Sequence, residues 1–320
     1  MLAVYQRETK GLNMDYDNYI ELYEAVYFFG RINGFVDSGP SNLKQLKSSG
    51  LNQSVYNAMI RILVANGLLE QDGNDFVLTR KNKEQHRHIL DNIIGKGQKE
   101  HYAQMFDNAT GDSSFFFDTL SQLEYDIYSR YNFQVTFKIG KEVAKHINVA
   151  HRKVLELGGN SGGFGTALLA RKQDCSYTIV DTKIPCLVGN ELKKETGADI
   201  EFTEGDIFEL ALPDESYNDV ILMNLLHDFD DLKCLEILRR CTKYCDHHTK
   251  FLIIEDILTS TFEPKDALMH GLRLAVSCKG GKQRTIGEFT GLFSAINYKL
   301  EKTITLDSIH TMLILGHCDA

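Results

Sequence analysis

One histidine stands where this sequence could carry chemistry. The stretch ILMNLLHDFDDLKCLEILRRC begins at Ile221, and His227 follows an apolar segment that is typical of a buried strand. Asp228 comes next, and an amphipathic helical pattern begins at about Asp231. An imidazole has an unperturbed pKa of about 6.5, so it can take up or release a proton near neutral pH. His227 therefore either caps local structure or moves a proton at the mouth of a pocket.

A glycine-rich turn, VLELGGNSGGFG, lies at a predicted junction between a strand and a helix. Its glycines, Gly158 and Gly159 among them, leave the backbone bare for a ligand, and the free N–H groups of the new helix favour an anion. Asp181 ends the next predicted strand, where a carboxylate can accept two hydrogen bonds from a ribose diol. Asp206 follows the third strand and can meet an adenine amine, while Ile207 packs on the ring. Together these residues predict a site for an adenosine-containing cofactor.

Two cofactors compete for such a site. A dinucleotide would prefer the spacing G-x-G-x-x-G, which fails here because Asn160 stands two residues after Gly158. S-adenosylmethionine has no phosphate, only an α-carboxylate and a sulfonium, and tolerates looser glycine spacing. We therefore expect S-adenosylmethionine. The alternative, a dinucleotide oxidoreductase, would bind NAD tightly.

Six segments, in chain order, resemble one enzyme family. LELGGNSGG, IVD, GDIFE, LLHDFDDLKCLEILRRC, IIEDIL and GGKQRTIGEF are similar to motifs of the small-molecule O-methyltransferases of plants and bacteria. The likeness covers nearly all of residues 152–300 and, more loosely, the N-terminal half. It implies a winged-helix-like dimerisation domain before a Rossmann-like methyltransferase domain, and therefore a homodimer. Its most specific motif is the H-D-[WF]-x-D segment that begins at His227.

The resemblance also implies roles for single residues. His227 would be the general base that deprotonates the substrate hydroxyl, and Glu255 would flank its imidazole. Physical chemistry agrees, because a phenol with a pKa of about 10 is mostly protonated at neutral pH and a base assists as the O–C bond forms. A carboxylate at the end of the neighbouring strand can orient the ring and stabilise its cation. We place Asn224 near the cofactor and expect a hydroxylated aromatic or related secondary metabolite as the acceptor.

Two positions depart from the family pattern. Asn160 replaces one glycine of the family's trio, and asparagine tolerates a left-handed backbone. Gln283, in GGKQRT, stands where many relatives carry glutamate. If Gln283 lies near His227, one of two flanking charges is missing, and the imidazolium is less stabilised.

The second departure leaves a rival chemistry open. Some relatives bind iron through the His-Asp pair and a second histidine, and they methylate the carbon next to the keto group of a 2-oxo acid. Here His227, Asp228 and His270 would supply two histidines and one carboxylate, with open positions for such an acid. In the simpler reading no metal is bound, and Asp228, His270 and Gln283 contact the substrate or the core.

The elements that position these residues alternate between strands and helices from residue 152 onward. Strands are predicted within 153–159, 177–181, 199–206, 217–226, 250–258, 298–305 and 310–317. Helices are predicted over 164–172, 186–196, 231–245, 266–276 and 285–296. This order indicates a doubly wound α/β fold, a Rossmann-like mixed sheet of seven strands whose last two form an antiparallel edge.

The N-terminal half is predicted to be mainly helical. We divide the chain into a winged-helix-like domain (1–100), a helical linker that roofs the pocket (101–145) and the methyltransferase domain (146–320). A helix from Asp15 to about Arg31 has apolar coverage too wide for a surface helix, so it must bury against something, and a second subunit is a good candidate.

Residues 41–78 have the outline of a winged helix. Helices are expected over 41–50 and 53–65, followed by a hairpin that turns at Asp72 and Gly73. A DNA-binding regulator that senses a ligand is therefore an alternative function. The second of these helices carries only Arg61 as a cation, and residues 1–100 show no basic face, which favours packing or dimerisation.

Composition narrows the function classes. The formal net charge of −9 opposes binding to nucleic acid or anionic membranes as the main activity. No apolar run approaches the roughly 18 to 20 residues of a membrane span, and the first residues lack the apolar core of a secretory signal. The seven scattered cysteines indicate reduced thiols, so we expect a cytoplasmic enzyme. Cys241 and Cys245, near two histidines, fit a buried helix stripe better than a zinc site.

Overall fold

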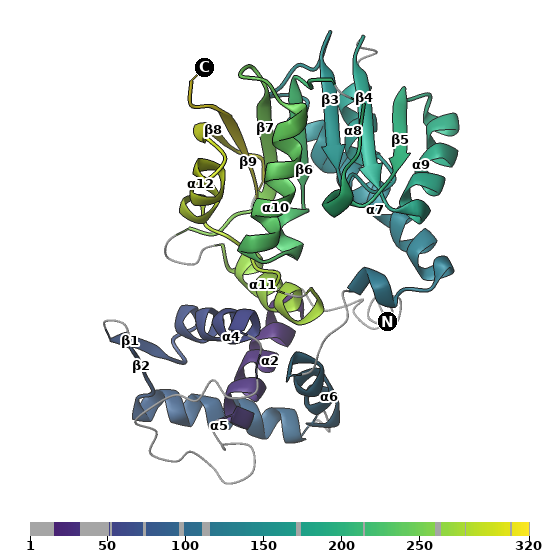
Figure 1. Ribbon diagram of the computed structural model, residues 1–320. Helices are drawn as coiled ribbons and strands as arrows, with labels where there is room; N and C mark the ends of the chain where they lie inside the picture. Colours follow the sequence, from purple (N-terminus) through teal and green to yellow (C-terminus); the bar gives the residue numbers. More distant parts are fainter. Residues whose placement is uncertain are drawn as a thin grey trace.

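The structure is a computed structural model with two parts, a small helical N-terminal part and a larger part built on a sheet (Figure 1). It describes residues 16–32, 51, 53–72, 75–95, 99–110, 116–170, 174–213, 215–259, 264–278, 280–307 and 309–319. The helix predicted over 41–50 lies outside the described residues, and so does Gly73 of the predicted turn.

A seven-stranded sheet forms the centre of the larger part, in the order β5-β4-β3-β6-β7-β9-β8. Its strands are β3 (Lys153–Leu157), β4 (Ser176–Asp181), β5 (Ile200–Glu204), β6 (Asp219–Met223), β7 (Lys250–Asp256), β8 (Tyr298–Thr305) and β9 (His310–His317). The strands from β5 to β7 are parallel, and β9 pairs antiparallel with both β7 and β8. This confirms the predicted mixed α/β fold with its antiparallel edge.

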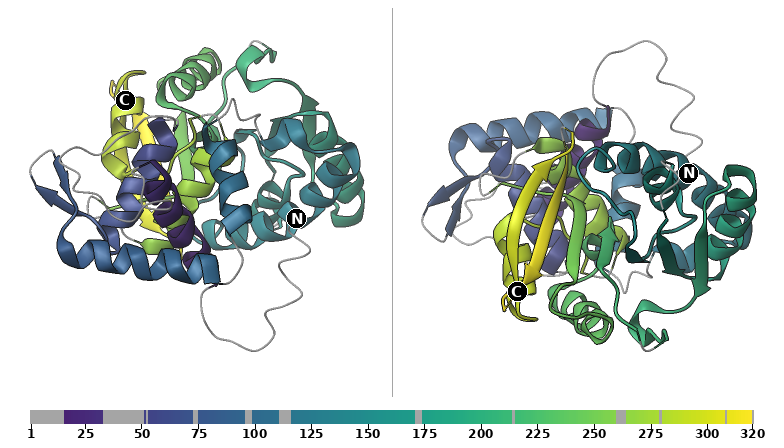
Figure 2. Two further views of the ribbon diagram at one scale, coloured as in Figure 1. Left: turned by 90° about the horizontal axis from the view of Figure 1, so that it is seen from below. Right: turned by 90° about the horizontal axis from the view of Figure 1, so that it is seen from above.

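Helices cover both faces of the sheet (Figures 1 and 2). They are α7 (Gln122–Val143), α8 (Gly163–Leu169), α9 (Lys183–Thr196), α10 (Asp231–Cys241) and α12 (Ile286–Ser294). Because side chains alternate along a strand, Val220 and Leu222 of β6 pack on the face under α10 and α12, whereas Ile221 packs on the face under α7 and α8. The central strands are buried on both faces, which explains their continuous apolar sequences.

The N-terminal part surrounds one apolar helix. It consists of α2 (Tyr16–Ile32), α4 (Gln53–Ala65), the antiparallel hairpin of β1 (Glu70–Asp72) and β2 (Asp75–Val77), α5 (Arg80–Gly95) and α6 (Lys99–Thr110). Residues 24–30 of α2 are buried against these helices. The packing partners that the sequence predicted for this helix are thus other helices of the same chain. Among the described residues, no helix is both long enough and apolar enough to cross a bilayer.

A helix from the second half of the sequence completes the N-terminal core. α11 (Lys265–Ser277) packs against α2 and α4, and its Leu268 and Leu272 are buried in the same apolar cluster as Phe28. Arg61 of α4 also points to the larger part, where it pairs with Glu288 at 3.4 Å. The arginine of the predicted recognition helix is therefore engaged within the chain, which counts against the DNA-binding alternative.

Candidate active site

The carboxyl ends of the parallel strands bring the predicted site residues to one edge of the sheet. The glycine turn follows β3, and Asp181 ends β4. The short helices η2 (Ile207–Glu209) and η3 (Leu226–Asp228) follow β5 and β6, and Glu255 is the last residue but one of β7. Ligands of doubly wound folds bind at this edge, so the geometry agrees with the predicted location.

His227 and Glu255 lie in contact at the centre of this edge. Nδ1 of His227 is 2.7 Å from Oε2 of Glu255, a carboxylate with no exposed surface. The other oxygen of Glu255 accepts hydrogen bonds from the backbone N–H groups of Leu225 at 3.1 Å and Leu226 at 3.0 Å. The carboxylate is thus fixed by the segment that carries the histidine, and it turns Nε2 of the ring away from β7.

The charges around His227 favour its protonated form. Burial lowers the pKa of His227, but the negative charges of Glu255 and Asp228 outweigh this effect and raise the pKa to about 9. Oδ1 of Asp228 lies 3.6 Å from Nε2 of the ring. Asp228 therefore provides a second flanking charge, although Gln283 provides none. In the free protein the ring is protonated at neutral pH, and it must lose that proton before it can act as a base.

Asp228 is buried and receives a hydrogen bond from a cysteine. The thiol of Cys278 donates to Oδ1 of Asp228 at 3.1 Å. Burial raises the pKa of Asp228, and the neighbouring imidazole and thiol partly offset that rise. Cys278 ends α11, so this contact ties the site to the helix that packs into the N-terminal part.

The glycine turn is tied to the end of β4 through Asp181. Its Oδ2 accepts a hydrogen bond from the N–H of Asn160 at 2.8 Å, and its Oδ1 accepts one from the N–H of Thr182 at 2.7 Å. Burial raises the pKa of Asp181 to about 6, although these hydrogen bonds lower it. Asn160 has φ of 51°, so the predicted left-handed backbone is confirmed. Oδ1 also accepts the Thr182 hydroxyl at 3.3 Å, so Oδ2 is the oxygen that keeps a lone pair for a ribose hydroxyl.

Packing beneath the turn explains two of its glycines. A Cβ added to Gly158 would lie 2.6 Å from a methyl group of Leu225, and one added to Gly159 would lie 2.7 Å from the carboxyl carbon of Glu156. The sequence interpretation assigned these glycines to contact with a ligand alone. The structure adds that side chains of the protein fill the space on their inner side.

The predicted adenine end of the site contains an aromatic pair. Asp206 is exposed, and its side chain caps η2 by accepting the N–H of Phe208 at 2.8 Å. Phe208 meets Phe229 edge to face, with ring centroids 5.3 Å apart, and Ile207 is half-buried beside them. Asn224 has φ of 47°, and its Oδ1 is buried without a hydrogen-bond partner in the described part of the chain. That oxygen is available to a ligand donor.

The sequence interpretation missed the specific aromatic residues above the site. Tyr128 of α7 lies within electrostatic range of both Asp228 and Asp181, since burial and the charges of these carboxylates raise its pKa. Its ring meets Phe117 at 5.5 Å between centroids, and the hydroxyl of Tyr125 lies 3.0 Å from the Thr182 hydroxyl. The run of aromatics over 113–133 was the available signal, and it predicted a pocket roof without identifying its members.

Arg284 was missed altogether. It is completely buried and donates to the carbonyls of Leu226 and Phe229, both at 2.7 Å, and to Asp231 at 2.8 Å. It therefore fixes both ends of the segment that carries His227. The motif GGKQRT contained the signal, because an arginine next to an apolar helix needs several acceptors when it is buried.

The structure does not gather the proposed iron ligands. Nδ1 of His270 lies 3.0 Å from Oδ2 of Asp256, in an arrangement separate from the contact between His227 and Asp228. Across the ranges that the structure describes, no group of three histidine, cysteine or carboxylate side chains is placed to hold a metal ion. Gln283 is buried, with its Oε1 unpaired among those residues.

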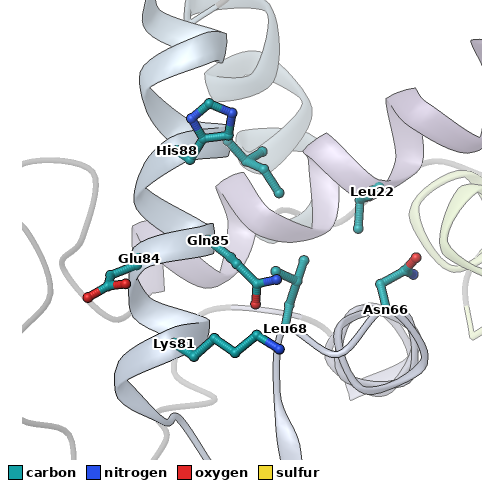
Figure 3. Close-up of a pocket in the computed structure, with 8 residues that line it drawn as sticks. Leu22, Asn66, Leu68, Lys81, Glu84, Gln85 and His88 are labelled. Carbon is teal, nitrogen blue, oxygen red and sulfur yellow. The ribbon is translucent and has the colours of Figure 1, made fainter.

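An open groove of about 500 Å³ lies in the N-terminal part (Figure 3). It is lined by Leu22, Asn66, Leu68, Lys81, Glu84, Gln85, His88 and Ile89. Five of these residues, Lys81, Glu84, Gln85, His88 and Ile89, come from α5. None of them was predicted as a site residue, so this groove is distinct from the edge that carries the chemistry.

Comparison with known proteins identifies the family of the chain. A family model described as an O-methyltransferase domain matches residues 87–299. The chain is 28% identical over 149 residues to acetylserotonin O-methyltransferase of Gallus gallus, which is 46% of this chain and 42% of that protein. It is 22% identical over 292 residues to O-methyltransferase 7 of Dictyostelium discoideum, which is 83% and 82% of the two chains. The first alignment thus spans less than half of the relative.

A solved structure shows the same fold over nearly the whole chain. The O-methyltransferase family 2 protein from Planctomyces limnophilus DSM 3776, in complex with apigenin, superposes with a TM-score of 0.77. The alignment covers 95% of this chain and 97% of that one at 16% identity, so it speaks for the fold alone. Because the family model covers more than half of the sequence, the chain belongs to the O-methyltransferase family, the S-adenosylmethionine-dependent enzymes that its motifs predicted.

Proposed function

We propose that this protein transfers a methyl group from S-adenosylmethionine to a hydroxyl of a small aromatic molecule, with His227 as the general base. The observation that carries the proposal is the contact of 2.7 Å between His227 and Glu255 at the edge where the glycine turn also lies. A buried imidazole–carboxylate pair at a ligand-binding edge is the arrangement that proton abstraction needs.

The residues around the glycine turn suit the cofactor. Oδ2 of Asp181 can accept a ribose hydroxyl, and the unpaired Oδ1 of Asn224 can accept a donor of the amino-acid end. Asp206 and the edge-to-face pair of Phe208 and Phe229 can hold the adenine. When bound, S-adenosylmethionine supplies an electrophilic methyl group on a positively charged sulfur.

The roles of the protein's own groups follow from their charges. His227 is protonated in the free protein because its pKa is about 9. A cation placed near it lowers that pKa by Coulomb repulsion, so donor binding favours the neutral ring. Neutral Nε2 then accepts the proton of the acceptor hydroxyl as the new bond forms, and Glu255 stabilises the resulting imidazolium. The fixed carboxylate keeps the ring oriented throughout.

Two observations support a small aromatic molecule as the methyl acceptor. The chicken relative is named for acetylserotonin, and the neighbour from Planctomyces was solved with apigenin. Here the cluster of Phe116, Phe117, Tyr125 and Tyr128 provides aromatic faces near both carboxylates of the site. Such faces bind planar aromatic ligands by offset or edge-to-face contact.

The His227→Ala variant tests the assigned role. Calorimetry with S-adenosylmethionine should give an affinity within a few fold of the parent protein, whereas turnover in a labelled-methyl screen of phenols should fall about a hundredfold or more. His248→Ala, at an exposed loop position, is the control and should change neither quantity. Equal losses of affinity and turnover would show that His227 supports the fold rather than the proton transfer.

The second candidate is metal-assisted C-methylation of a 2-oxo acid. It rests on His227 and Asp228 being adjacent at the site, with His270 on the neighbouring helix. Iron analysis of the purified protein and of His270→Ala separates the two chemistries. Bound iron that is lost with His270 would replace the proposal of simple O-methylation.

For the assembly we propose a homodimer through the N-terminal part, as the family resemblance implies. Residues 24–30 of α2 are buried within the single chain, so the apolar coverage of this helix does not itself require a second copy. Sedimentation equilibrium of the purified protein tests the proposal, and a single species at the monomer mass would refute it.

A further inference from the structure

A second histidine–carboxylate pair lies one residue along β7 from the first. Nδ1 of His270 is 3.0 Å from Oδ2 of Asp256, the residue that follows Glu255. On its other side, Oδ1 of Asp256 is 3.3 Å from Nε2 of His310, whose Nδ1 lies 2.8 Å from Oδ2 of Asp307. The proposed methyl transfer uses none of these four side chains, so their arrangement needs another explanation.

The contact with Asp256 fixes the hydrogen-bonding character of His270. Burial raises the pKa of Asp256, but the hydrogen bond from His270 and the neighbouring imidazoles outweigh it and lower the pKa. The carboxylate is therefore ionised and can only accept. Nδ1 of His270 must be the donor, which leaves the lone pair on Nε2 in the neutral ring. That nitrogen accepts a hydrogen bond from a ligand.

The stripe of α11 that carries His270 extends to the methyl-transfer site. His270, Leu274 and Cys278 are spaced four residues apart, so they follow one side of the helix. At the end of this stripe, the thiol of Cys278 donates to Asp228, which adjoins His227. The other side of α11 is buried against the N-terminal part. His270 thus lies about two turns, roughly 12 Å, along the same wall from the contact with Asp228.

A second unpaired acceptor lies on this wall. Gln283 lies between Lys282 and Arg284, whose side chains both reach Asp231. It packs on α11, with Cγ 3.6 Å from where a Cβ of Gly271 would lie. Gln283 is 3% exposed, and its Oε1 has no hydrogen-bond partner in the described part of the chain. A buried amide oxygen without a partner can accept a hydrogen bond from a ligand donor.

We infer that His270 selects an acceptor that carries a further hydroxyl besides the one that is methylated, and that Gln283 offers a second hydrogen-bond acceptor on the same wall. Both offered atoms accept hydrogen bonds, so they recognise a donor, whereas a keto group or a carboxylate would present only lone pairs to them. Asp256 and His310 are positioning residues that hold the ring of His270 in the accepting tautomer. The inference rests on the proposed function, because it defines the substrate class of the same site.

Binding to matched aromatic probes tests this selection. The probes are 2-naphthol and the set of dihydroxynaphthalenes that add one hydroxyl to it, titrated by calorimetry into protein saturated with S-adenosylhomocysteine. At least one diol should bind about tenfold more tightly than 2-naphthol. In His270→Ala and in Asp256→Asn, which can donate to Nδ1 and reverse the tautomer, this ratio should fall to within about twofold. Leu274→Ala, on the same stripe, should weaken both ligands and keep the ratio.

Three results would contradict this selection of a further hydroxyl. Diols that bind no better than 2-naphthol, a preference that survives in His270→Ala, or no binding of any naphthol at millimolar concentration would overturn the inference. Transfer of labelled methyl groups to phenols by the same preparations tests the proposed function separately. Transfer without preference for diols overturns only the inference, whereas no transfer to any hydroxylated acceptor overturns the proposed function.

Discussion

Arg284 donates two hydrogen bonds to one carboxylate oxygen of Asp231, from Nε at 2.9 Å and from an Nη at 2.8 Å. Its remaining donors reach two backbone carbonyls, one at each end of the segment that contains His227. The guanidinium is the only side chain that offers so many donors in one rigid plane. The position of the proposed base thus depends on a residue that need not touch any ligand.

Arg284→Lys should therefore lower both stability and turnover. A lysine keeps the charge but leaves buried carbonyls unpaired, so the free energy of unfolding should fall by about 2–4 kcal/mol in a urea titration. Lys282→Ala is the control, because Lys282 also pairs with Asp231 but is partly exposed; it should cost less than about 1 kcal/mol. Similar losses in the two variants would contradict the role given to Arg284.

The protonation of His227 gives a pH dependence with a defined sign. Its pKa in the folded protein is about 9, above the usual value of about 6.5. The stabilisation from the charged ring is complete below pH 6.5 and is lost as the pH rises through about 9. The difference in unfolding free energy between the parent and His227→Gln should therefore shrink by on the order of 3 kcal/mol between pH 6 and pH 10.

Titration of the ring by NMR tests the cause of this shift. Asp228→Asn removes one of the charges that raise the pKa of His227, so the midpoint should move down from about 9 in that variant. Asp206→Asn, at the exposed N-cap of η2, should leave the midpoint in place. A midpoint near 6.5 in the parent protein would mean that Glu255 and Asp228 do not act on the ring as their distances indicate.

Gly159→Ala should disturb the cofactor turn. The new methyl group would lie 2.7 Å from the buried carboxyl carbon of Glu156, so the turn must shift. We expect a loss of about 2 kcal/mol in stability and at least tenfold weaker binding of S-adenosylhomocysteine by calorimetry. Gly291→Ala in α12 meets no atom within 4 Å, and it should stabilise the helix by about 0.5–1 kcal/mol. Unchanged cofactor affinity in Gly159→Ala would separate the turn from the cofactor site.

Chelation should leave O-methylation intact. The proton of a phenol can pass to His227 directly, so dialysis against a strong chelator is expected to change turnover by less than twofold. The same treatment would abolish C-methylation of a 2-oxo acid if His227, Asp228 and His270 held iron. Recovery of activity on adding ferrous ion alone would favour the second chemistry.

Much of the fold could be read from local patterns. The last two strands were predicted over 298–305 and 310–317, and the structure places β8 and β9 at these residues. Helix 53–65 was also correct, because Gln53 opens an amphipathic run that Gly67 stops. Helix 231–245 was predicted too long, and so was helix 285–296, which the structure confines to Ile286–Ser294. α10 ends at Cys241, since the next three residues tighten into a 3-10 turn in which the Thr242 hydroxyl bonds to the carbonyl of Arg239.

Site residues could be predicted only where a reactive side chain lies at or just after the end of a strand. His227, Glu255 and Asp181 each end or follow a strand, so the topology alone brings them to one edge. Pairings across the chain could not be derived in this way. Asp256 looked like one more residue of an apolar strand, and nothing in the sequence linked it to His270 fourteen residues later. Such contacts depend on how a helix is rotated, which local periodicity does not fix.

The placement of α11 has a consequence for how this enzyme can change. One side of the helix is part of the N-terminal core, and the other forms the wall that we assign to acceptor recognition. Arg61 of α4 also joins the N-terminal part to this wall, because it donates to the carbonyl of Gln283, 222 positions away. Grafting an N-terminal part from a relative would therefore alter substrate choice without replacing any residue of the recipient's catalytic half. We expect new substrate specificities in this family to arise through paired substitutions on the two sides of the interface between α11 and the N-terminal part.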